Sequence, residues 1–315
     1  MKKLGTILFF LFTTSVSFSQ EIIFEIPEKD LITEGIAFDP LTKDFYISSI
    51  FKNKIVKISK QGVSDFIESD QDGFVGGVGL HVDSKRRILW ACSGNIIGKS
   101  FSAGIFAYDL KTKKLLKKFS YPLDTIKRFF NDLVISPDGS IYITDTYGHC
   151  IWKWSMSMKE PIKLKLNKPF TYPNGITISR DGKFLLVATD NGLQRVDIKS
   201  NIVETIKMND DNVSSKGLDG IELYKNSIIG IQNALEGKPN KVIRYFLSND
   251  FQSIHKTKII DSNNKYFDVP TTLAIANGYL YVLANSQMDN LNQENLTIIA
   301  PEKLTSTYIL KYRLH

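Results

Sequence analysis

The sequence contains little cysteine and almost no helical periodicity. Its 315 residues include only Cys92 and Cys150, which excludes a small scaffold held together by several disulfides. Both cysteines lie in apolar, strand-like text, WACS and HCIWKW. We expect two buried free thiols, with a single disulfide between them as the alternative in an oxidising compartment. The near absence of a 3.6-residue apolar repeat argues against a helical fold.

A long apolar run is also missing, and the N-terminus holds only a short one. The text MKKLGTILFFLFTTSVSFSQ places two lysines before an apolar run from Leu4 to Val16 and small residues around Ser19. This pattern predicts a secretory signal peptide over residues 1–19, cleaved after Ser19. The run is too short to span a bilayer, and no cysteine at the junction offers a lipid anchor. We therefore expect a secreted or periplasmic protein with no membrane insertion after cleavage.

The charge is not concentrated on any segment. The net charge of +7 falls to about +5 without the two lysines of the signal peptide. The remaining basic residues are scattered in stretches such as SKRR and KKLLKK, which argues against a nucleic-acid partner. Hydrophobic residues make up 43% of the chain and charged residues 23%, values typical of a globular protein with a core.

An internal repeat dominates the mature chain. A polar residue, a glycine-like position, an apolar strand, a turn and a second strand occur six times, 43 to 53 residues apart. Further strand-like text follows each copy, for example KIVKISK and GLQRVDI. One copy per four-stranded blade is the period of a β-propeller. The sequence predicts an all-β, six-bladed β-propeller over residues 20–315, as a single domain.

The two ends of the mature chain are expected to meet. The C-terminal STYILKYRL and the early EIIFEIPE read as strands of the same last blade, which closes the ring and leaves no free sheet edge. Because a closed propeller has no need of a partner chain, we expect a monomer.

The first residue of each repeat opens on the central tunnel at one face of the disc. These residues are Glu34, Val78, Asn131, Asn174, Asp219 and Thr271. Four of the six carry side-chain oxygen donors. Asn and Asp before a strand are common turn caps, but turn chemistry does not explain their shared position in repeats far apart in the chain. Converging carboxylates repel each other without a cation, so a cation site on the axis is predicted.

The ordered set of motifs resembles the senescence marker protein/gluconolactonase family, which includes regucalcin, and more distantly the paraoxonases. The resemblance rests on Glu34-Gly35, Asn131-Asp132 before SPDG, PNGITISRDGK around Asn174, and LDGIE around Asp219. It covers essentially the whole mature chain. It implies one divalent cation at the tunnel mouth, with Glu34, Asn174 and Asp219 as direct ligands.

In this resemblance, Asn131 is a further ligand or a substrate contact through water. An all-oxygen donor set suits Ca²⁺ best, while Zn²⁺ more often recruits His or Cys; Zn²⁺, Mg²⁺ and Mn²⁺ stay open. The implied reaction is hydrolysis of a small-molecule lactone or cyclic ester. In it the cation polarises the carbonyl group and Asp219 acts as general base.

Some residues depart from the family pattern. The family's substrate-gripping arginine stands two positions before the asparagine, whereas Arg128 stands three before Asn131, so Arg128 is a substrate-binding candidate with altered spacing. Asp132 is a candidate for a second, buried calcium, as in paraoxonases. Strand alternation places His81 off the tunnel axis, packed between blades. His149 in DTYGHC is similar to a structural histidine of NHL repeats.

Two alternatives to a lactonase remain. The first is a non-enzymatic propeller that binds a protein or glycan through its top face, where Asn285–Pro301 forms a long polar loop. The second is condensation chemistry of the strictosidine synthase type, against which the four metal-type residues argue. Fold alone does not decide between them, and the top-face loops Gln71–Gly79, Tyr121–Phe130 and Ser286–Pro301 are expected to set specificity.

Overall fold

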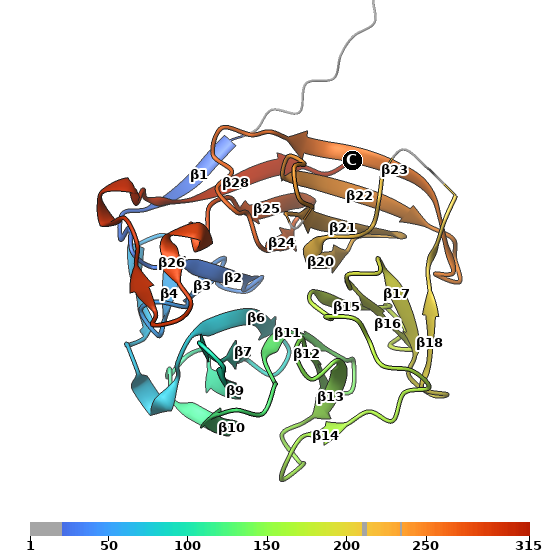
Figure 1. The fold of residues 1–315 in the computed structure, drawn as a ribbon, viewed down its shortest axis with the longest axis horizontal. Coiled ribbons are helices and arrows are strands. Elements are labelled where there is room, and N and C mark those ends of the chain that lie inside the picture. The colour runs from blue at the N-terminus through green and yellow to red at the C-terminus, as the bar shows by residue number, and fades with distance from the viewer. Residues whose placement is uncertain (1–20, 210–212, 234) are drawn as a thin grey trace, which may run out of the picture.

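The computed structural model describes residues 21–209, 213–233 and 235–315. The predicted signal peptide, residues 1–19, lies outside the described residues. Six antiparallel sheets stand around a central axis (Figure 1), which confirms the predicted six-bladed β-propeller. Over the described ranges, no helix is long and apolar enough to cross a membrane.

Blades 1 to 3 follow one another along the chain, and their strands are given from the tunnel outward. Blade 1 comprises β2 (Thr33–Phe38), β3 (Phe45–Ser49), β4 (Lys54–Ser59) and β5 (Gly62–Ile67). Blade 2 comprises β6 (Gly77–Asp83), β7 (Ile88–Ser93), β9 (Ser100–Asp109) and β10 (Leu115–Asp124), with β8 (Ile96–Ile97) paired to β9. Blade 3 comprises β11 (Phe130–Ile135), β12 (Ile141–Asp145), β13 (Cys150–Trp154) and β14 (Ile162–Lys163).

Blades 4 to 6 complete the ring. Blade 4 comprises β15 (Ile176–Ile178), β16 (Phe184–Val187), β17 (Gln194–Asp197) and β18 (Ile202–Thr205). Blade 5 comprises β20 (Leu218–Leu223), β21 (Ser227–Gln232), β22 (Lys241–Leu247) and β23 (Ser253–Ser262), with β19 (Lys207–Met208) beyond β23. Blade 6 comprises β24 (Leu273–Ala276), β25 (Tyr279–Leu283), β28 (Thr307–Arg313) and β1 (Glu21–Ile26).

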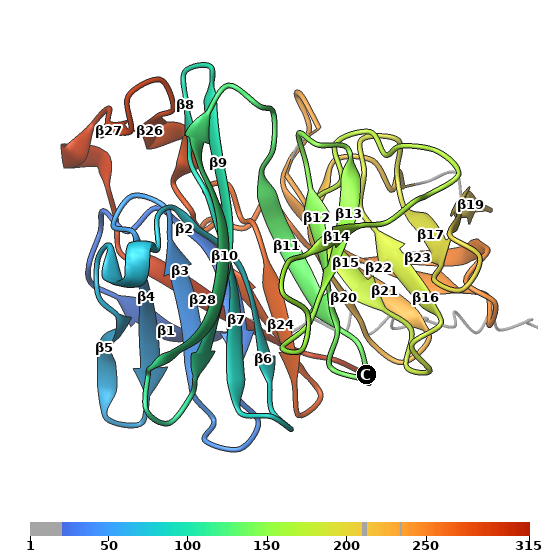
Figure 2. The same ribbon diagram turned by 90° about the horizontal axis from the view of Figure 1, so that it is seen from below.

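Short elements decorate the loops. A hairpin of β26 (Leu291–Asn292) and β27 (Thr297–Ile298) lies between β25 and β28, and three single 3₁₀ turns span Gln71–Gly73, Met288–Asn290 and Pro301–Lys303. In the side view, β26, β27 and β8 stand at the same face of the disc (Figure 2). The described residues are otherwise strands, turns and loops.

Ring closure joins the two ends of the described chain. Strand β1 pairs antiparallel with β28, which places Glu21 opposite Lys311 and Ile26 opposite Thr307. The N-terminal strand is therefore the outermost strand of the last blade, as the sequence predicts. Its hydrogen bonds to β28 hold the ring shut.

The apolar core lies between neighbouring blades. Between blades 6 and 1, the rings of Phe45 and Tyr281 meet edge-on at 4.8 Å. Between blades 2 and 3, Trp90 and Trp154 meet at 5.8 Å. Because both faces of a middle strand are covered by adjacent blades, strands such as β21 are buried throughout. Both cysteines are buried free thiols, as expected.

Glycines allow the innermost strands to approach closely at the tunnel mouth. A Cβ atom on Gly35 would lie 2.2 Å from the Val78 carbonyl oxygen, and one on Gly175 would lie 2.4 Å from the Asp219 carbonyl oxygen. Any side chain at these positions would clash with the neighbouring blade's backbone. The glycine-like position of the repeat is thus the point where one blade contacts the next.

A β-bulge occurs at this same position in four blades. The strand register shifts between Thr33 and Ile36, Gly77 and Leu80, Phe130 and Leu133, and Leu218 and Ile221. A bulge inserts an extra residue and re-aims the side chains around it. In these four blades it therefore gives the first residue of the repeat an orientation that a regular strand would not provide.

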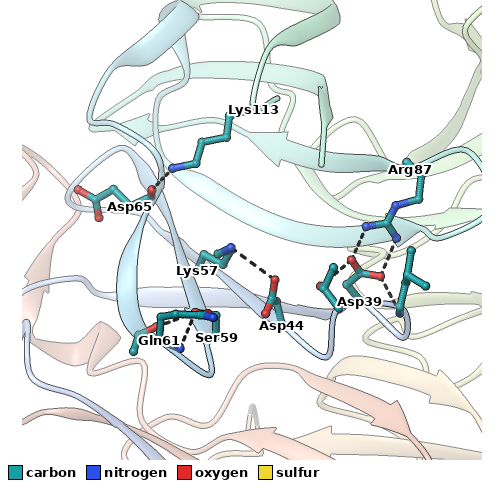
Figure 3. A network of polar contacts seen from close by, with 11 residues as sticks. Asp39, Asp44, Lys57, Ser59, Gln61, Asp65, Arg87 and Lys113 are labelled. Carbon is teal, nitrogen blue, oxygen red and sulfur yellow. Dashed lines mark hydrogen bonds and ion pairs between the residues drawn. The ribbon is translucent and has the colours of Figure 1, made fainter. Parts of the chain in front are cut away.

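An ion pair joins blades 1 and 2 at the opposite end of the disc. Arg87 donates two hydrogen bonds, of 2.7 and 2.6 Å, to the fully buried carboxylate of Asp39 (Figure 3). Burial opposes ionisation of Asp39, but hydrogen bonds from Arg87, Leu41 and Thr42 lower its pKa overall. Beside it, Lys57 pairs with Asp44 at 3.4 Å. This network holds two blades together far from the tunnel mouth.

Candidate metal and substrate site at the tunnel mouth

Two buried carboxylates stand at the mouth of the tunnel. Glu34 on β2 is 8% exposed and Asp219 on β20 is 6% exposed. The hydroxyls of Thr271 and Thr272 donate to the Glu34 carbonyl oxygen at 2.8 and 2.7 Å, which fixes the backbone of blade 1 against blade 6. The first residues of blades 1, 5 and 6 thus meet at the mouth.

Each of these carboxylates keeps one oxygen without a partner. Glu34 Oε2 and Asp219 Oδ1 are buried and accept no hydrogen bond. Burial raises the pKa of Glu34 well above its ordinary value, and the nearby charges of Asp219 and Asp132 raise it further. Burial likewise raises the pKa of Asp219 to about 6, against the hydrogen-bonding side chains of Asn233 and Asn174. The mouth therefore carries two buried carboxylate oxygens, one of Glu34 and one of Asp219, that accept no hydrogen bond of normal geometry.

The two predicted amides lie with these carboxylates. Asn174 follows Pro173 at the start of blade 4, and its side chain interacts with Asp219. Its backbone is fixed by hydrogen bonds with Ala188 at 2.9 Å and Thr144 at 2.7 Å. Asn131, the second residue of β11, lines the same cavity as Glu34. The structure thus brings the four oxygen-donor residues to one end of the tunnel.

Asn233 contacts the site but is not one of the repeat's first residues. It follows β21 and donates from Nδ2 to Asp219 Oδ2 at 2.7 Å and to the Pro270 carbonyl oxygen at 2.8 Å. It therefore orients the Asp219 carboxylate and leaves Oδ1 without a hydrogen bond. Asn233 stands at the end of the second strand of its repeat, where the other repeats carry Ser, Thr or Asn, and this shared polar end is the signal that could have identified it.

Asp132 occupies the glycine-like position of blade 3. Its Oδ1 accepts from the Leu133 N–H at 2.8 Å and its Oδ2 from the Ile176 N–H of blade 4 at 3.1 Å. Burial raises its pKa to about 7, although these two hydrogen bonds oppose the shift. Its carboxylate thus bridges two blades just inside the mouth. The predicted second calcium at Asp132 stays a prediction.

Arg128 lies away from the other predicted site residues. Its guanidinium group pairs with Asp124 at 3.1 Å and stacks 4.1 Å from the centre of the Tyr121 ring. The following residue, Phe129, lines the cavity at the mouth, whereas Arg128 does not. The extra residue between Arg128 and Asn131 turns the arginine toward the outer strand of blade 2, so the structure does not bring Arg128 together with the four oxygen donors.

The expectation for His81 is wrong. The ring does not lie covered between blades, because His81 lines a tunnel cavity of about 210 Å³ together with Glu222 of blade 5 and Ile36 of blade 1. The innermost strand of a blade pairs with no further strand along its inner edge. Side chains near that edge can therefore border the tunnel. Burial lowers the pKa of His81 to about 4, and burial with the charge of Asp132 raises the pKa of Glu222 to about 8.

A second cavity of about 210 Å³ opens at the mouth itself. Glu34 and Asn131 contribute polar groups to it, and the loop around Asn95 and the insertion before β28 contribute its outer walls. We call it the mouth cavity. His149 is not among its lining residues: its ring lies 4.8 Å from that of Tyr172 and accepts a hydrogen bond from the Tyr172 N–H at 3.4 Å.

The donor set at the mouth fits a hard cation better than a transition metal. Over the part of the chain that the structure describes, His, Cys, Asp and Glu side chains form no group of three or more that could hold a metal ion. The donor set at the mouth instead combines the two carboxylates, Glu34 and Asp219, with the amides of Asn131 and Asn174. Carboxylate and amide oxygens are the ligands of Ca²⁺.

Comparisons with known proteins agree with this architecture. Residues 131–154, which cover most of the inner three strands of blade 3, match the NHL repeat. A search of curated protein sequences finds no match. A gluconolactonase from Xanthomonas campestris is similar in structure, with a TM-score of 0.59 and 11% identity over 92% of this chain and 89% of that chain.

Two further solved structures are similar over nearly their whole length. The major Malassezia sympodialis allergen Mala s 1 has a TM-score of 0.67 and 16% identity over 91% of this chain and 95% of that chain. Virginiamycin B lyase from Staphylococcus aureus has a TM-score of 0.61 and 14% identity over 95% of this chain and 100% of that chain. These likenesses establish the fold. Function has to be argued from the site.

Proposed function

We propose that the protein is a metal-dependent hydrolase that opens a lactone or related cyclic ester at the tunnel mouth. The observation that carries the proposal is the pair of buried, unpartnered carboxylate oxygens, Glu34 Oε2 and Asp219 Oδ1, of which Glu34 also lines the mouth cavity. Two carboxylates held together in this way are costly unless a cation is bound between them. The similarity to a gluconolactonase fold supports the same reading.

The residues proposed to hold the cation are Glu34, Asn131, Asn174 and Asp219. Ca²⁺ is the preferred ion because all four supply oxygen, and Zn²⁺, Mg²⁺ and Mn²⁺ are the alternatives to test. When bound, such an ion would polarise the ester carbonyl and stabilise the negative charge that develops on its oxygen. Asn131 faces the mouth cavity and is proposed to contact the substrate as well.

Asp219 is proposed to act as the general base. The oxygen of a water molecule forms a bond to the ester carbonyl carbon while Asp219 accepts a proton from that water. The ring C–O bond then breaks, and the leaving alkoxide takes up the proton to give the hydroxy acid. Asn233 holds the Asp219 carboxylate in a fixed orientation through its 2.7 Å hydrogen bond, which leaves Oδ1 available.

Substitution of two of the proposed cation ligands tests the proposal. Asp219→Ala and Asn174→Ala are expected to lower kcat/KM for lactones by at least about 100-fold, with the circular dichroism spectrum of the wild type retained. Removal of metal by a chelator, followed by addition of single divalent ions, identifies the ion. Retained turnover of every lactone by Asp219→Ala would rule out the base assignment.

The same experiments distinguish a hydrolase from a propeller that only binds a partner. Tight cation binding without turnover of aldonolactones, homoserine lactones or aryl esters would favour a non-enzymatic protein that binds a partner through the mouth face. We further propose an extracytoplasmic location, from the N-terminal sequence alone. Sequencing the N-terminus of the mature protein tests it, with Gln20 expected as the first residue.

A further inference from the structure

The mouth cavity is walled on one side by two hairpins from different blades. The turn that carries β8 extends from blade 2, and the β26–β27 hairpin extends from blade 6. The Gly98 N–H donates to the Gln293 carbonyl oxygen at 3.3 Å, which joins the two hairpins above the mouth. Both stand at the same face of the disc (Figure 2). Neither belongs to the propeller repeat.

Besides Asn95 and Gln293, these hairpins present three apolar side chains to the cavity. Ile96 of β8, Leu291 of β26 and Leu296 of the hairpin turn line it. Leu291 also packs in an apolar cluster with Ile32 and Leu304 on top of blades 1 and 6. This second contact anchors the hairpin to the body of the protein, so the wall is held in place rather than left as a free loop.

Another part of the lining is aromatic. Phe129 and Tyr147 line the cavity. The Tyr147 ring lies 5.1 Å from Phe101, 6.5 Å from Phe129 and 5.9 Å from Tyr172. Aromatic rings packed against one another in this way present a large apolar surface with little freedom to move. The polar groups of Glu34 and Asn131 therefore share the cavity with apolar and aromatic side chains from blades 2, 3 and 6.

The hydrogen-bonding side chains that line the cavity are neutral apart from Glu34, and seven apolar side chains line it beside them. Among the residues that the structure describes, no Lys, Arg or His side chain lines it. Arg128, the candidate for gripping a sugar, is instead bound to Asp124 and Tyr121. Each buried hydroxyl left without a hydrogen bond costs roughly 1–3 kcal/mol, whereas each buried CH₂ group contributes about 0.8 kcal/mol.

We propose that the mouth cavity binds an apolar substituent of the substrate, so that the preferred substrates are alkyl- or aryl-substituted lactones and not sugar lactones. This inference rests on the proposed lactonase function. The cavity of about 210 Å³ is smaller than the roughly 300–1,000 Å³ of a typical drug-sized site. A short alkyl chain or a single ring is the expected occupant, placed between Ile96, Leu291 and Phe129, with the ester group over Glu34 and Asn131.

A set of δ-lactones with one common ring tests the preference. The three substrates are δ-octanolactone, unsubstituted δ-valerolactone and glucono-δ-lactone. If the three-carbon chain is buried, kcat/KM for δ-octanolactone should exceed that for δ-valerolactone by about 50-fold, since about 0.8 kcal/mol per CH₂ is about fourfold. Glucono-δ-lactone should be the poorest of the three. A higher kcat/KM for glucono-δ-lactone would overturn the inference and leave the lactonase function standing.

Two variants on β8 test whether Ile96 forms part of the cavity wall. Ile96→Thr places a hydroxyl in the wall and should lower kcat/KM for δ-octanolactone about tenfold, with δ-valerolactone little affected. Ile97→Thr is the matched control, because Ile97 is the next residue of β8 and lines a different cavity. Equal losses in both variants, or no loss in either, would contradict the assignment of the wall.

A binding measurement covers the case in which no lactone is hydrolysed. The δ-lactam of 5-aminooctanoic acid and unsubstituted 2-piperidone are stable to hydrolysis and can be titrated calorimetrically into the full chain with Ca²⁺ present. Tighter binding of the propyl-substituted lactam, weakened by Ile96→Thr but not by Ile97→Thr, would support the cavity even if the lactonase function failed. Equal binding of the two lactams would overturn it.

Discussion

Replacing Asn233 by alanine should weaken cation binding at the mouth without disturbing the propeller. Asn233 donates one hydrogen bond to Asp219 Oδ2 and one to the Pro270 carbonyl oxygen. It contributes no oxygen to the proposed cation site in this orientation, since its amide nitrogen faces the carboxylate. Any effect of the substitution on a bound cation must therefore arise from a change in the position or charge of Asp219.

The structure sets the expected size of the effect. A hydrogen bond to a charged group contributes about 1.5–3 kcal/mol, and removing an outer partner of a metal ligand commonly lowers metal affinity by about 10–100-fold. That range corresponds to about 1.4–2.7 kcal/mol, so the two figures agree. We expect the dissociation constant for Ca²⁺ to rise by about 10–100-fold in Asn233→Ala.

Calorimetric titration of Ca²⁺ into metal-free protein measures this change directly. Asn226→Ala is a matched control in the same blade: Asn226 donates to the Leu247 carbonyl oxygen at 2.6 Å, at the opposite end of β21. The control should lose folding stability yet keep its Ca²⁺ affinity. The reasoning fails if Asn233→Ala binds Ca²⁺ as tightly as the wild type, because Asp219 would then not be a cation ligand held by Asn233.

Two further predictions concern regions away from the mouth. Arg87→Leu leaves the buried Asp39 carboxylate unpaired, at a cost of about 3 kcal/mol, and should lower the Tm by roughly 6–12 °C with lactonase activity unchanged. The double variant Arg87→Leu with Asp39→Asn should lose less unfolding free energy than the two single variants lose together. Losses that simply add would contradict the ion pair. Glu222→Gln should stabilise the protein relative to the wild type at pH 8 by up to about 4 kcal/mol. Burial raises the folded pKa of Glu222 to about 8 from 4.5, so its ionisation opposes folding increasingly as the pH rises through this range. The gain in urea unfolding free energy should vanish at pH 4, and an equal gain at both pH values would show that burial of this carboxyl is not the cause.

The repeat made the fold and most of the mouth predictable from the sequence. Because each blade begins with the same pattern, residues such as Glu34 and Asp219 could be aligned without coordinates, and the structure brings them to one end of the tunnel. The glycine-like position was visible as a pattern. The physical reason for it is that a Cβ atom at Gly35 would lie 2.2 Å from the Val78 carbonyl oxygen of the neighbouring blade, and a sequence does not contain such distances.

Other features depended on contacts between distant segments. Asn233 stands at the polar end of the second strand of its repeat, but its hydrogen bond to Asp219 appears only in the folded chain. His81 was misplaced because alternation gives the face of a strand but not what stands opposite that face. The β8 and β26–β27 hairpins are insertions, and their conformation is set by contacts such as that between Gly98 and Gln293. The apolar walls of the mouth cavity arise only when these insertions meet.

The pairing of β1 with β28 also constrains how the protein is made. The first described strand finds its place only beside the last one, with residue 21 opposite residue 311. During synthesis blade 6 lacks its inner strands until β24, β25 and β28 have been made, so the ring stays open and the mouth residues of blades 1 and 6 stay apart until then. Bringing such distant segments together costs loop entropy before any contact offsets it. Because the ring closes only at this stage, the preceding chain stays open, which is compatible with the proposed passage across a membrane before folding.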